Sequence, residues 1–393
     1  MKIILVHNYY QQPGGEDQVY AQERRLLENQ GHEVLCYTRS NDELRKASPL
    51  QKLLWPKQMI WAKDTHREFR DILREEKPDL VHVHNTFIQI SPSIFAACRD
   101  VGIPVVQTLH NFRLLCPAAT FFREGKVCEE CRDFGLWRGI QHACYRQSTV
   151  ATAAVAAMLT AHRSARTWVD NVTGYIALTQ FARDKFTKGG LSPEKIRVKP
   201  NFVSPDPGVK EWAGAGAVFV GRLSPEKGVK TLLEGWERLR SPVPLRIIGD
   251  GPLRQDLELI KSQRSLSHVS FLGHLSHQEV QAAIKSAKFL VLPSECYENF
   301  PLTIVEAFSC GTPIICSRLG AMQEIVANEH TGLHFTPGNA DELAEKVEWA
   351  CNRSRQIDEM SRAARLEFEQ KYTAEHNYST LMDIYRQANP ACC

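Results

Sequence analysis

Short apolar runs rich in β-branched residues recur along the chain and alternate with longer, more polar segments. Runs of this length are typical of strands buried on both faces of a parallel sheet, because neither face then needs polar side chains. They predict strands at residues 3–6, 34–37, 80–83, 104–108, 174–178, 217–220, 245–248, 269–272, 289–292 and 313–316. Helical segments lie between them, such as residues 18–29 ending at Gly31, so the pattern predicts two doubly wound α/β domains in tandem.

A linker is predicted at residues 199–208, which hold three prolines and a glycine in ten positions. We therefore expect a first domain over residues 1–203, with a cysteine-rich insert at 113–146, and a second over 204–371, followed by a C-terminal helix within 372–393. Ligands of open parallel sheets bind beyond the carboxyl ends of the strands. A ligand site in a cleft between the two domains is expected on this ground.

The composition is that of a globular protein, with 43% hydrophobic and 24% charged residues among 393, which excludes a disordered chain, collagen and a coiled coil. No apolar run reaches the ~18 residues of a membrane span, and the run at 3–6 is too short for a secretory signal, so a cytoplasmic protein is expected. Residues 1–205 carry 28 Lys and Arg against 21 Asp and Glu, or +7. The remaining residues carry 20 against 24, or −4, so the first half is expected to meet something anionic, but no nucleic acid.

Two glycine-containing turns follow predicted strands and precede predicted helices. Gly14 and Gly15 come after the first strand, where they could let a ligand approach the backbone or simply form a turn. Gly221 ends the strand at 217–220, and Arg222 and Lys227 follow on the loop. A forked guanidinium and an ammonium suit a diphosphate, although two solvated cations would give the same pattern. The dinucleotide pattern G-x-G-x-x-G is absent after both strands, which disfavours a hydride-transfer enzyme.

The segment after the strand at 289–292 carries two acidic residues eight positions apart, Glu298 on a loop and Glu306 within an apolar helix. A helix that begins near Pro301 directs free backbone N–H groups at this loop. Burying an unpaired carboxylate is costly, so Glu306 is a better candidate for a ligand contact than a surface Glu. The alternative is a solvated helix face.

These motifs, in this order and at these strand ends, resemble the retaining glycosyltransferases of family 4, which have the GT-B fold, over nearly the whole chain. The resemblance implies that Arg222 and Lys227 neutralise the donor diphosphate in place of a metal, consistent with the absence of a D-x-D motif. It implies that Glu298 binds the donor sugar hydroxyls and Glu306 the ribose. His110, at the end of the strand at 104–108, stands where the family often has a His near the donor sugar.

The loop residues Asn299, Phe300 and Leu302 occupy the family's donor loop, and Pro301, which has no N–H, stands where many members have Gly. The resemblance also implies that the helix at 372–388 crosses back to the first domain. The expected activity is transfer of a hexosyl group from a UDP- or GDP-type sugar to a glycan or lipid-linked glycan in surface polysaccharide biosynthesis, with no cofactor required. The alternatives are a sugar-nucleotide epimerase of the same fold and a non-catalytic nucleotide- or metal-binding scaffold.

Four cysteines, Cys116, Cys128, Cys131 and Cys144, lie close together in the insert. Cys128 and Cys131 have the C-x2-C spacing of half a zinc site, so a structural zinc or an iron–sulfur cluster is expected, with free thiols or a redox pair as the alternative. Residues 45–63 contain five basic residues, no acid and two tryptophans, a pattern that favours peripheral attachment to an anionic membrane. Pro56 is expected to interrupt any helix there, and an ordinary packed helix is the alternative.

Overall fold

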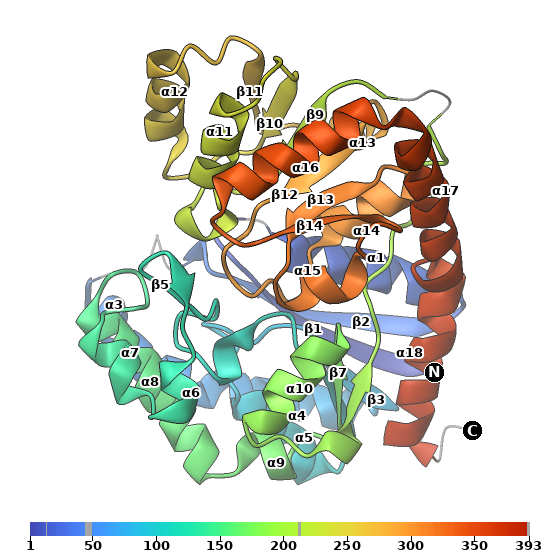
Figure 1. The fold of residues 1–393 in the computed structure, drawn as a ribbon. Helices are drawn as coiled ribbons and strands as arrows, with labels where there is room; N and C mark the ends of the chain where they lie inside the picture. The colour runs from blue at the N-terminus through green and yellow to red at the C-terminus, as the bar shows by residue number, and fades with distance from the viewer. Residues whose placement is uncertain (13, 44–48, 211–213, 391–393) are drawn as a thin grey trace. The chain divides into compact units, whose positions relative to one another are not determined.

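Two six-stranded sheets, in which every strand pairing is parallel, organise the computed structural model (Figure 1). The structure describes residues 1–12, 14–43, 49–210 and 214–390. The chain divides into unit 1, made of Met1–Phe121, Cys128–Pro200 and Asn377–Cys393, and unit 2, made of Phe122–Val127 and Asn201–His376. Each unit contains one of the two sheets, so the prediction of two Rossmann-like α/β domains is confirmed.

In the sheet of unit 1 the first strand lies between the second and the third, so the chain winds in both directions from it, as in doubly wound folds. Its order is β2 (Glu33–Ser40), β1 (Lys2–Tyr9), β3 (Leu80–Val83), β4 (Val105–Thr108), β7 (Gly174–Ala177) and β8 (Ile196–Val198). The long helices are α1 (Gly15–Asn29), α3 (Pro49–Ile60), α4 (Lys63–Glu76), α5 (Ser93–Val101), α8 (Thr149–Ser164) and α10 (Gln180–Lys188). Short helices are α6 (Glu130–Asp133), α7 (Trp137–Gln141) and α9 (Thr167–Asp170).

The last helix, α18 (Ala374–Ala388), contributes its residues from Asn377 onward to unit 1. The Tyr385 hydroxyl lies 2.7 Å from His82 Nδ1, and the Tyr378 hydroxyl lies 2.8 Å from His32 Nε2. These contacts join the C-terminal end of the chain to β3 and to the turn before β2.

The sheet of unit 2 is also parallel and doubly wound, but its first strand, β9, is third in the order. Its order is β11 (Val269–Gly273), β10 (Leu245–Ile248), β9 (Ala217–Val220), β12 (Phe289–Leu292), β13 (Ile314–Ser317) and β14 (Gly332–Phe335). Its helices are α11 (Val229–Glu237), α12 (Arg254–Gln263), α13 (His277–Lys285), α14 (Leu302–Ser309), α15 (Gly320–Ile325), α16 (Ala340–Asn352) and α17 (Ser354–Lys371). A separate hairpin pairs β5 (Phe122–Arg123) with β6 (Lys126–Val127).

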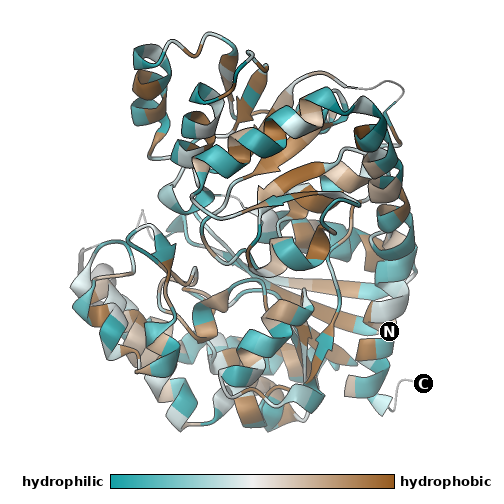
Figure 2. Ribbon diagram, viewed as in Figure 1, coloured by the Kyte–Doolittle hydropathy of each residue, from teal (hydrophilic) through white to brown (hydrophobic). Residues whose placement is uncertain are grey.

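Apolar side chains fill both faces of the second sheet, as the continuous apolar strands require. Phe219 packs with Trp236 in one buried cluster, whereas its neighbour Val218 packs with Phe308 in another. Figure 2 shows the same division, with hydrophobic strands inside and hydrophilic residues on the helices outside. No helix in the described ranges has the length and apolar character needed to cross a bilayer.

Apart from shifts at the ends of strands, the structure differs from the sequence-based expectation in three places. Strands β8 and β14 were not predicted, because β8 has three residues and β14 contains no β-branched residue. Helix α1 begins at Gly15 rather than residue 18, since acidic residues are stable in a first helical turn. Pro56 lies inside α3, so the expectation that it interrupts the helix is wrong. Of the basic residues predicted to attach to a membrane, Arg45 and Lys46 lie outside the described residues.

Candidate functional site

Two loops of unit 2 are held together where neighbouring strands end. Strands β9 and β12 pair in the sheet, so the loops that follow them emerge side by side. Gly228 has a φ of +65°, and a Cβ there would lie 1.9 Å from the Pro293 carbonyl oxygen. The Glu295 N–H donates to the Glu226 carbonyl at 2.9 Å. Glycine at position 228 therefore permits a close backbone contact that brings the loop of Lys227 against the loop of Glu298.

Lys227 and Glu298, predicted for different parts of the donor, form an ion pair in this structure. Lys227 Nζ lies 2.6 Å from Glu298 Oε1, and the Ser294 hydroxyl donates to the same oxygen at 2.7 Å. Burial opposes both charges, but the attraction of each for the other outweighs it. The pKa of Lys227 is therefore raised and the pKa of Glu298 lowered, so both side chains are charged at neutral pH.

The Arg222 side chain is exposed, on the loop that directly follows Gly221 and β9. Among the described residues, its guanidinium makes no hydrogen bond or ion pair. The loop after β9 therefore presents one cation that is already paired and one that is open to a ligand.

The helix predicted near Pro301 is α14, which begins at Leu302 with Pro301 as its N-cap. Glu306 lies in this helix, and its side chain is 6% exposed. His277 Nδ1 lies 3.8 Å from Glu306 Oε1. Glu306 is thus a buried carboxylate with an exposed imidazole beside it, which excludes the alternative of a solvated helix face.

The residues that precede α14 pack into unit 2. Asn299 is buried, and the half-buried Phe300 ring meets the Tyr372 ring edge-on at 6.2 Å between centroids. The Phe300 side chain therefore contributes to the fold, which leaves its backbone N–H as the group the resemblance assigns to the donor phosphate.

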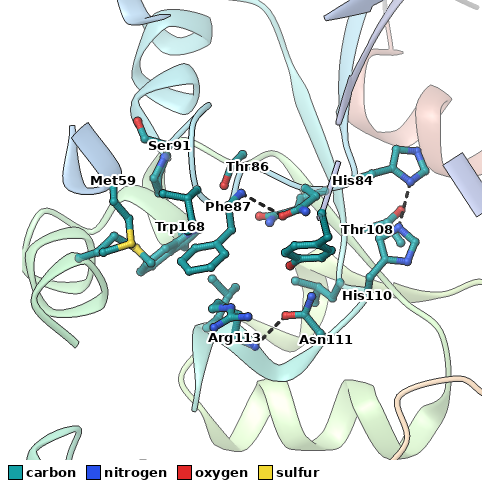
Figure 3. Close-up of a pocket in the computed structure, with 18 residues that line it drawn as sticks. Met59, His84, Thr86, Phe87, Ser91, Thr108, His110, Asn111, Arg113 and Trp168 are labelled. Carbon is teal, nitrogen blue, oxygen red and sulfur yellow. Dashed lines mark hydrogen bonds between the residues drawn. The ribbon is translucent and has the colours of Figure 1, made fainter. Parts of the chain in front are cut away.

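His110 follows β4 in unit 1 and lines a pocket at the carboxyl ends of β3 and β4 (Figure 3). Its Nε2 lies 2.9 Å from His84 Nδ1. Burial, reinforced by neighbouring histidines, lowers the pKa of His84 to about 4 and holds the pKa of His110 well below its ordinary range. Both imidazoles are therefore neutral at pH 7, and His110 can exchange hydrogen bonds with a ligand without adding charge.

A fully buried charged network lies behind His84. Glu23 Oε1 lies 2.9 Å from His82 Nδ1 and 3.3 Å from His84 Nε2, and Glu23 Oε2 lies 2.9 Å from Lys199 Nζ. Burial favours the neutral acid, but Lys199 and His82 outweigh it and hold the pKa of Glu23 well below its ordinary value. Glu23, His82 and His84 have the donor spacing of a metal site, but the Lys199 ammonium already supplies the positive charge that an ion would bring.

The predicted glycines, Gly14 and Gly15, lie at the start of α1, and a Cβ on either would meet nothing within 4 Å. The Gly14 N–H donates to Asp17 Oδ2 at 2.8 Å, and Glu16 stands beside it in the first turn. The Asp17 carboxylate already accepts the Gly14 N–H and opposes a bound anion, so the expected attraction of an anion to this turn is weakened.

Glu16 accepts hydrogen bonds from two side-chain amides that line the His110 pocket. Asn85 Nδ2 donates to Glu16 Oε1 at 3.0 Å, and Asn111 Nδ2 donates to Oε2 at 3.2 Å. Burial, with a contribution from the Asp17 charge, raises the pKa of Glu16 to about 8. The carboxyl group therefore titrates close to neutral pH.

The four insert cysteines all lie in unit 1 as free thiols. Cys116 and Cys131 are buried, whereas Cys128 and Cys144 are half-buried.

Comparison with known proteins accounts for most of the chain. Residues 13–207 match the model of Glycosyltransferase Family 4, and residues 215–367 match the model of Glycosyl transferases group 1. The chain belongs to family 4 of the glycosyltransferases. The predicted resemblance is therefore confirmed at the level of the family.

Two curated relatives of this family 4 member come from Methanocaldococcus jannaschii, and both are uncharacterized glycosyltransferases. One is 30% identical over 170 residues, which is 43% of this chain and 47% of that protein. The other is 25% identical over 350 residues, which is 85% of this chain and 82% of that protein. The chain thus spans about half the length of the first relative.

A solved structure with the same fold is HepE from Anabaena in complex with UDP, with a TM-score of 0.69 and 18% identity over 98% of this chain and 99% of that one. Such structural neighbours are GT-B glycosyltransferases, which confirms the predicted fold class.

The sequence did not indicate the residues that hold the predicted site residues in place. Ser294, which holds Glu298, and Glu295, which ties the two loops, lie in the segment that follows β12 but carry no pattern of their own. In unit 1, the missed residues are Glu23, His84 and Lys199. The one available signal was the run His82-Val83-His84-Asn85, directly after an apolar strand.

Proposed function

We propose that the chain is a retaining, metal-independent hexosyltransferase. It would move a sugar from a UDP- or GDP-type donor to a hydroxyl group of a glycan or lipid-linked glycan in surface polysaccharide biosynthesis. The observation that carries the proposal is the Lys227–Glu298 ion pair beside the exposed Arg222, at the carboxyl ends of β9 and β12. Family membership and the UDP complex of the HepE neighbour support the donor class.

A donor diphosphate would redistribute the charges of this site. Phosphate oxygens would compete with Glu298 for the Lys227 ammonium, which lies 2.6 Å from the carboxylate, and Arg222 would supply a second set of donors. Glu298 would then be released to accept hydrogen bonds from the sugar hydroxyls. Arg222 and Lys227 would stabilise the negative charge that develops on the diphosphate as it departs.

The transfer itself would break the bond from the anomeric carbon to the diphosphate oxygen and form a bond to the acceptor hydroxyl oxygen on the same face. The departing diphosphate would take the acceptor proton. His110 would hold the donor sugar through a hydrogen bond, as its neutral imidazole allows. Glu306 would bind the ribose hydroxyls, and the backbone N–H groups of Phe300 and Leu302 would bind phosphate.

The test is the turnover of Lys227→Ala with a panel of UDP- and GDP-sugars and a lipid-linked glycan acceptor. We expect at least a tenfold lower rate, because one lost charge contact to a developing anion costs about 2–4 kcal/mol of barrier. Lys230→Ala is the matched control, since Lys230 is an exposed lysine three positions away in α11. A Lys227→Ala rate within a factor of three of the control would contradict the assigned phosphate site.

Further measurements separate this proposal from its alternatives. NMR of the product reports whether the anomeric configuration of the donor is retained. An epimerase would convert the sugar nucleotide without acceptor, and a scaffold would function unchanged after Glu298→Ala. His110→Ala should greatly reduce turnover while nucleotide binding stays measurable by calorimetry; near-normal turnover would exclude the role given to His110.

A lipid-linked acceptor would fit attachment of residues 45–63 to an anionic membrane. In the described part of this segment, Lys57 is exposed and the Trp61 side chain is 43% exposed, whereas Met59 is buried against unit 1. Sedimentation with phosphatidylglycerol vesicles at low salt tests the attachment. We expect binding that weakens with salt and with Lys57→Glu; failure to bind removes the membrane contact and leaves the donor chemistry untouched.

A further inference from the structure

A line of polar contacts runs from the buried Glu23 carboxylate to the pocket that His110 lines. Glu23 Oε1 lies 3.3 Å from His84 Nε2, on the side of the His84 ring that faces away from His110. His84 Nδ1 lies 2.9 Å from His110 Nε2, and Figure 3 shows this hydrogen bond between the two rings. The charge of Glu23 can therefore influence His110 through a single intervening imidazole.

The Glu23 carboxylate is ionised and fixed in place. Lys199 Nζ lies 2.9 Å from its Oε2, and His82 Nδ1 lies 2.9 Å from its Oε1. Burial favours the neutral acid, but Lys199 and His82 outweigh it and hold the pKa of Glu23 well below its ordinary value. His84 thus faces a permanent negative charge.

This charge decides which nitrogen of His84 carries the proton. Burial lowers the pKa of His84 to about 4, so the ring is neutral at pH 7 and has one N–H. A proton on Nδ1 would leave the Nε2 lone pair pointing at Glu23 Oε1, and this repulsion is strong where water is excluded. The proton therefore resides on Nε2, and Nδ1 is a hydrogen-bond acceptor.

The tautomer of His110 follows from that of His84. Because His84 Nδ1 accepts, His110 Nε2 must be the N–H that donates across the 2.9 Å contact. Burial, reinforced by the neighbouring histidines, holds the pKa of His110 well below its ordinary range, so the ring has no second proton. Its Nδ1 is then a lone-pair acceptor, and this atom has no hydrogen-bond partner within the described ranges of the chain.

We propose that Glu23 and His84 are positioning residues that hold His110 as the Nε2–H tautomer, so that His110 Nδ1 accepts a hydrogen bond from a hydroxyl group of the donor sugar. The identity of this ligand rests on the function proposed above, whereas the tautomer does not. A ligand oxygen without a proton, such as an ether, a carbonyl or a carboxylate, would face the lone pair of Nδ1 and bind more weakly.

The first test reads the tautomers directly. Long-range ¹H–¹⁵N spectra of full-length protein labelled with ¹⁵N-histidine distinguish Nδ1–H from Nε2–H at pH 8, where an exposed imidazole of pKa about 6.5 is neutral. His110→Gln and His84→Met assign the two residues by loss of their signals. We expect a single Nε2–H form for both, whereas the exposed His330 should show a mixture of tautomers. An Nδ1–H form of His110 in the wild-type protein would overturn the proposal.

A matched pair of variants tests whether His84 sets this tautomer. Glutamine at position 84 can accept from His110 through its carbonyl oxygen and donate to Glu23 through its amide, whereas methionine has a similar length and does neither. His84→Met should give His110 a mixture of tautomers and lower kcat about tenfold, the value of one hydrogen bond. His84→Gln should keep the Nε2–H form and a kcat within about threefold of wild type. Equal spectra or equal kcat in the two folded variants would overturn the positioning role, and the wild-type spectrum decides the tautomer if neither variant folds.

The last measurement tests the hydroxyl contact. The His110 ¹⁵Nδ1 resonance should move upfield when the sugar nucleotide that is turned over is added, but not with UDP or GDP alone, because a lone pair that accepts a hydrogen bond is less deshielded. Binding of the sugar nucleotide without this shift would overturn the contact. Failure of every UDP- and GDP-sugar to bind would overturn both the contact and the proposed function, whereas the spectra of the free protein decide the tautomer.

Discussion

The buried pair of Glu23 and Lys199 offers a direct measure of how unit 1 depends on one internal cation. Both side chains are at most 1% exposed, and their charged atoms lie 2.9 Å apart. Lys199→Met keeps the aliphatic volume and removes the charge. Removing one member of a buried pair typically costs 3–5 kcal/mol, because the remaining charge has no compensation.

The cost of protonating Glu23 gives a similar loss of folding free energy. Without Lys199, burial raises the pKa of Glu23, and the folded protein takes up a proton on this carboxyl group. Protonating a carboxyl of ordinary pKa about 4.3 costs about 3.7 kcal/mol at pH 7 and about 1.0 kcal/mol at pH 5. The penalty of Lys199→Met should therefore shrink by about 2.7 kcal/mol between pH 7 and pH 5.

In the wild-type protein, the contribution of this pair should stay constant between pH 7 and pH 5. Its Glu23 has a lowered pKa in the folded state, so the stabilisation is present above the ordinary pKa and is lost as the pH falls through the folded-state value. Urea unfolding at both pH values measures the free energy, and hydrogen exchange of peptides from α1 and β1 assigns the change to unit 1.

Two variants serve as controls for this experiment. Lys2→Met breaks a partly exposed pair with Glu76 at 2.6 Å in the same unit, and it should cost much less than Lys199→Met, because water screens this pair. Glu23→Gln combined with Lys199→Met removes both charges and should recover part of the loss. A Lys199→Met penalty below about 1 kcal/mol at pH 7, or one that is equal at pH 5, would refute the reasoning.

Two further predictions concern Gly249, directly after β10, and Glu16, in the first turn of α1. Gly249→Ala should destabilise unit 2 by more than the ~1 kcal/mol of an ordinary substitution, because Gly249 has a φ of +126° and a Cβ would lie 2.0 Å from the Gly221 carbonyl oxygen; thermal unfolding equal to wild type would contradict this. Glu16, with its pKa raised to about 8, binds a proton in the folded state that the unfolded chain releases, so stability should fall as the pH rises from 5 to 8. Glu16→Gln, which can still accept from Asn85, should flatten this fall in urea titrations; an unchanged slope would assign it to another group.

The strands that the sequence predicted with their observed bounds share one property. Residues 80–83, 217–220, 245–248 and 289–292 are buried between helices, so an apolar run ends where the strand ends. The run Gly332–Phe335 forms a strand because β13 offers it an edge, and nothing local in its residues indicates this.

The candidate site also depends on contacts that local sequence patterns do not indicate. Lys227 and Glu298 could each be identified from the loop that carries it, but their pairing depends on β9 lying beside β12 and on the Gly228–Pro293 contact. Glu23 and Lys199 stand 176 positions apart, and only the completed fold makes them neighbours. Sequence patterns report local chemistry, whereas the strand order decides which groups meet.

The position of α18 has a consequence for how the protein is made. Asn377 Oδ1 accepts a hydrogen bond from Lys199 at 3.2 Å, and the fully buried Tyr385 closes over His82. The strands of the first sheet are synthesised before the unit 2 segment Asn201–His376, whereas these two side chains are synthesised after it. Unit 1 must therefore wait, with Glu23 and its partners incompletely enclosed, until that segment of unit 2 has emerged. A nascent chain arrested before Asn377 should be more sensitive to protease in its N-terminal half than the released protein.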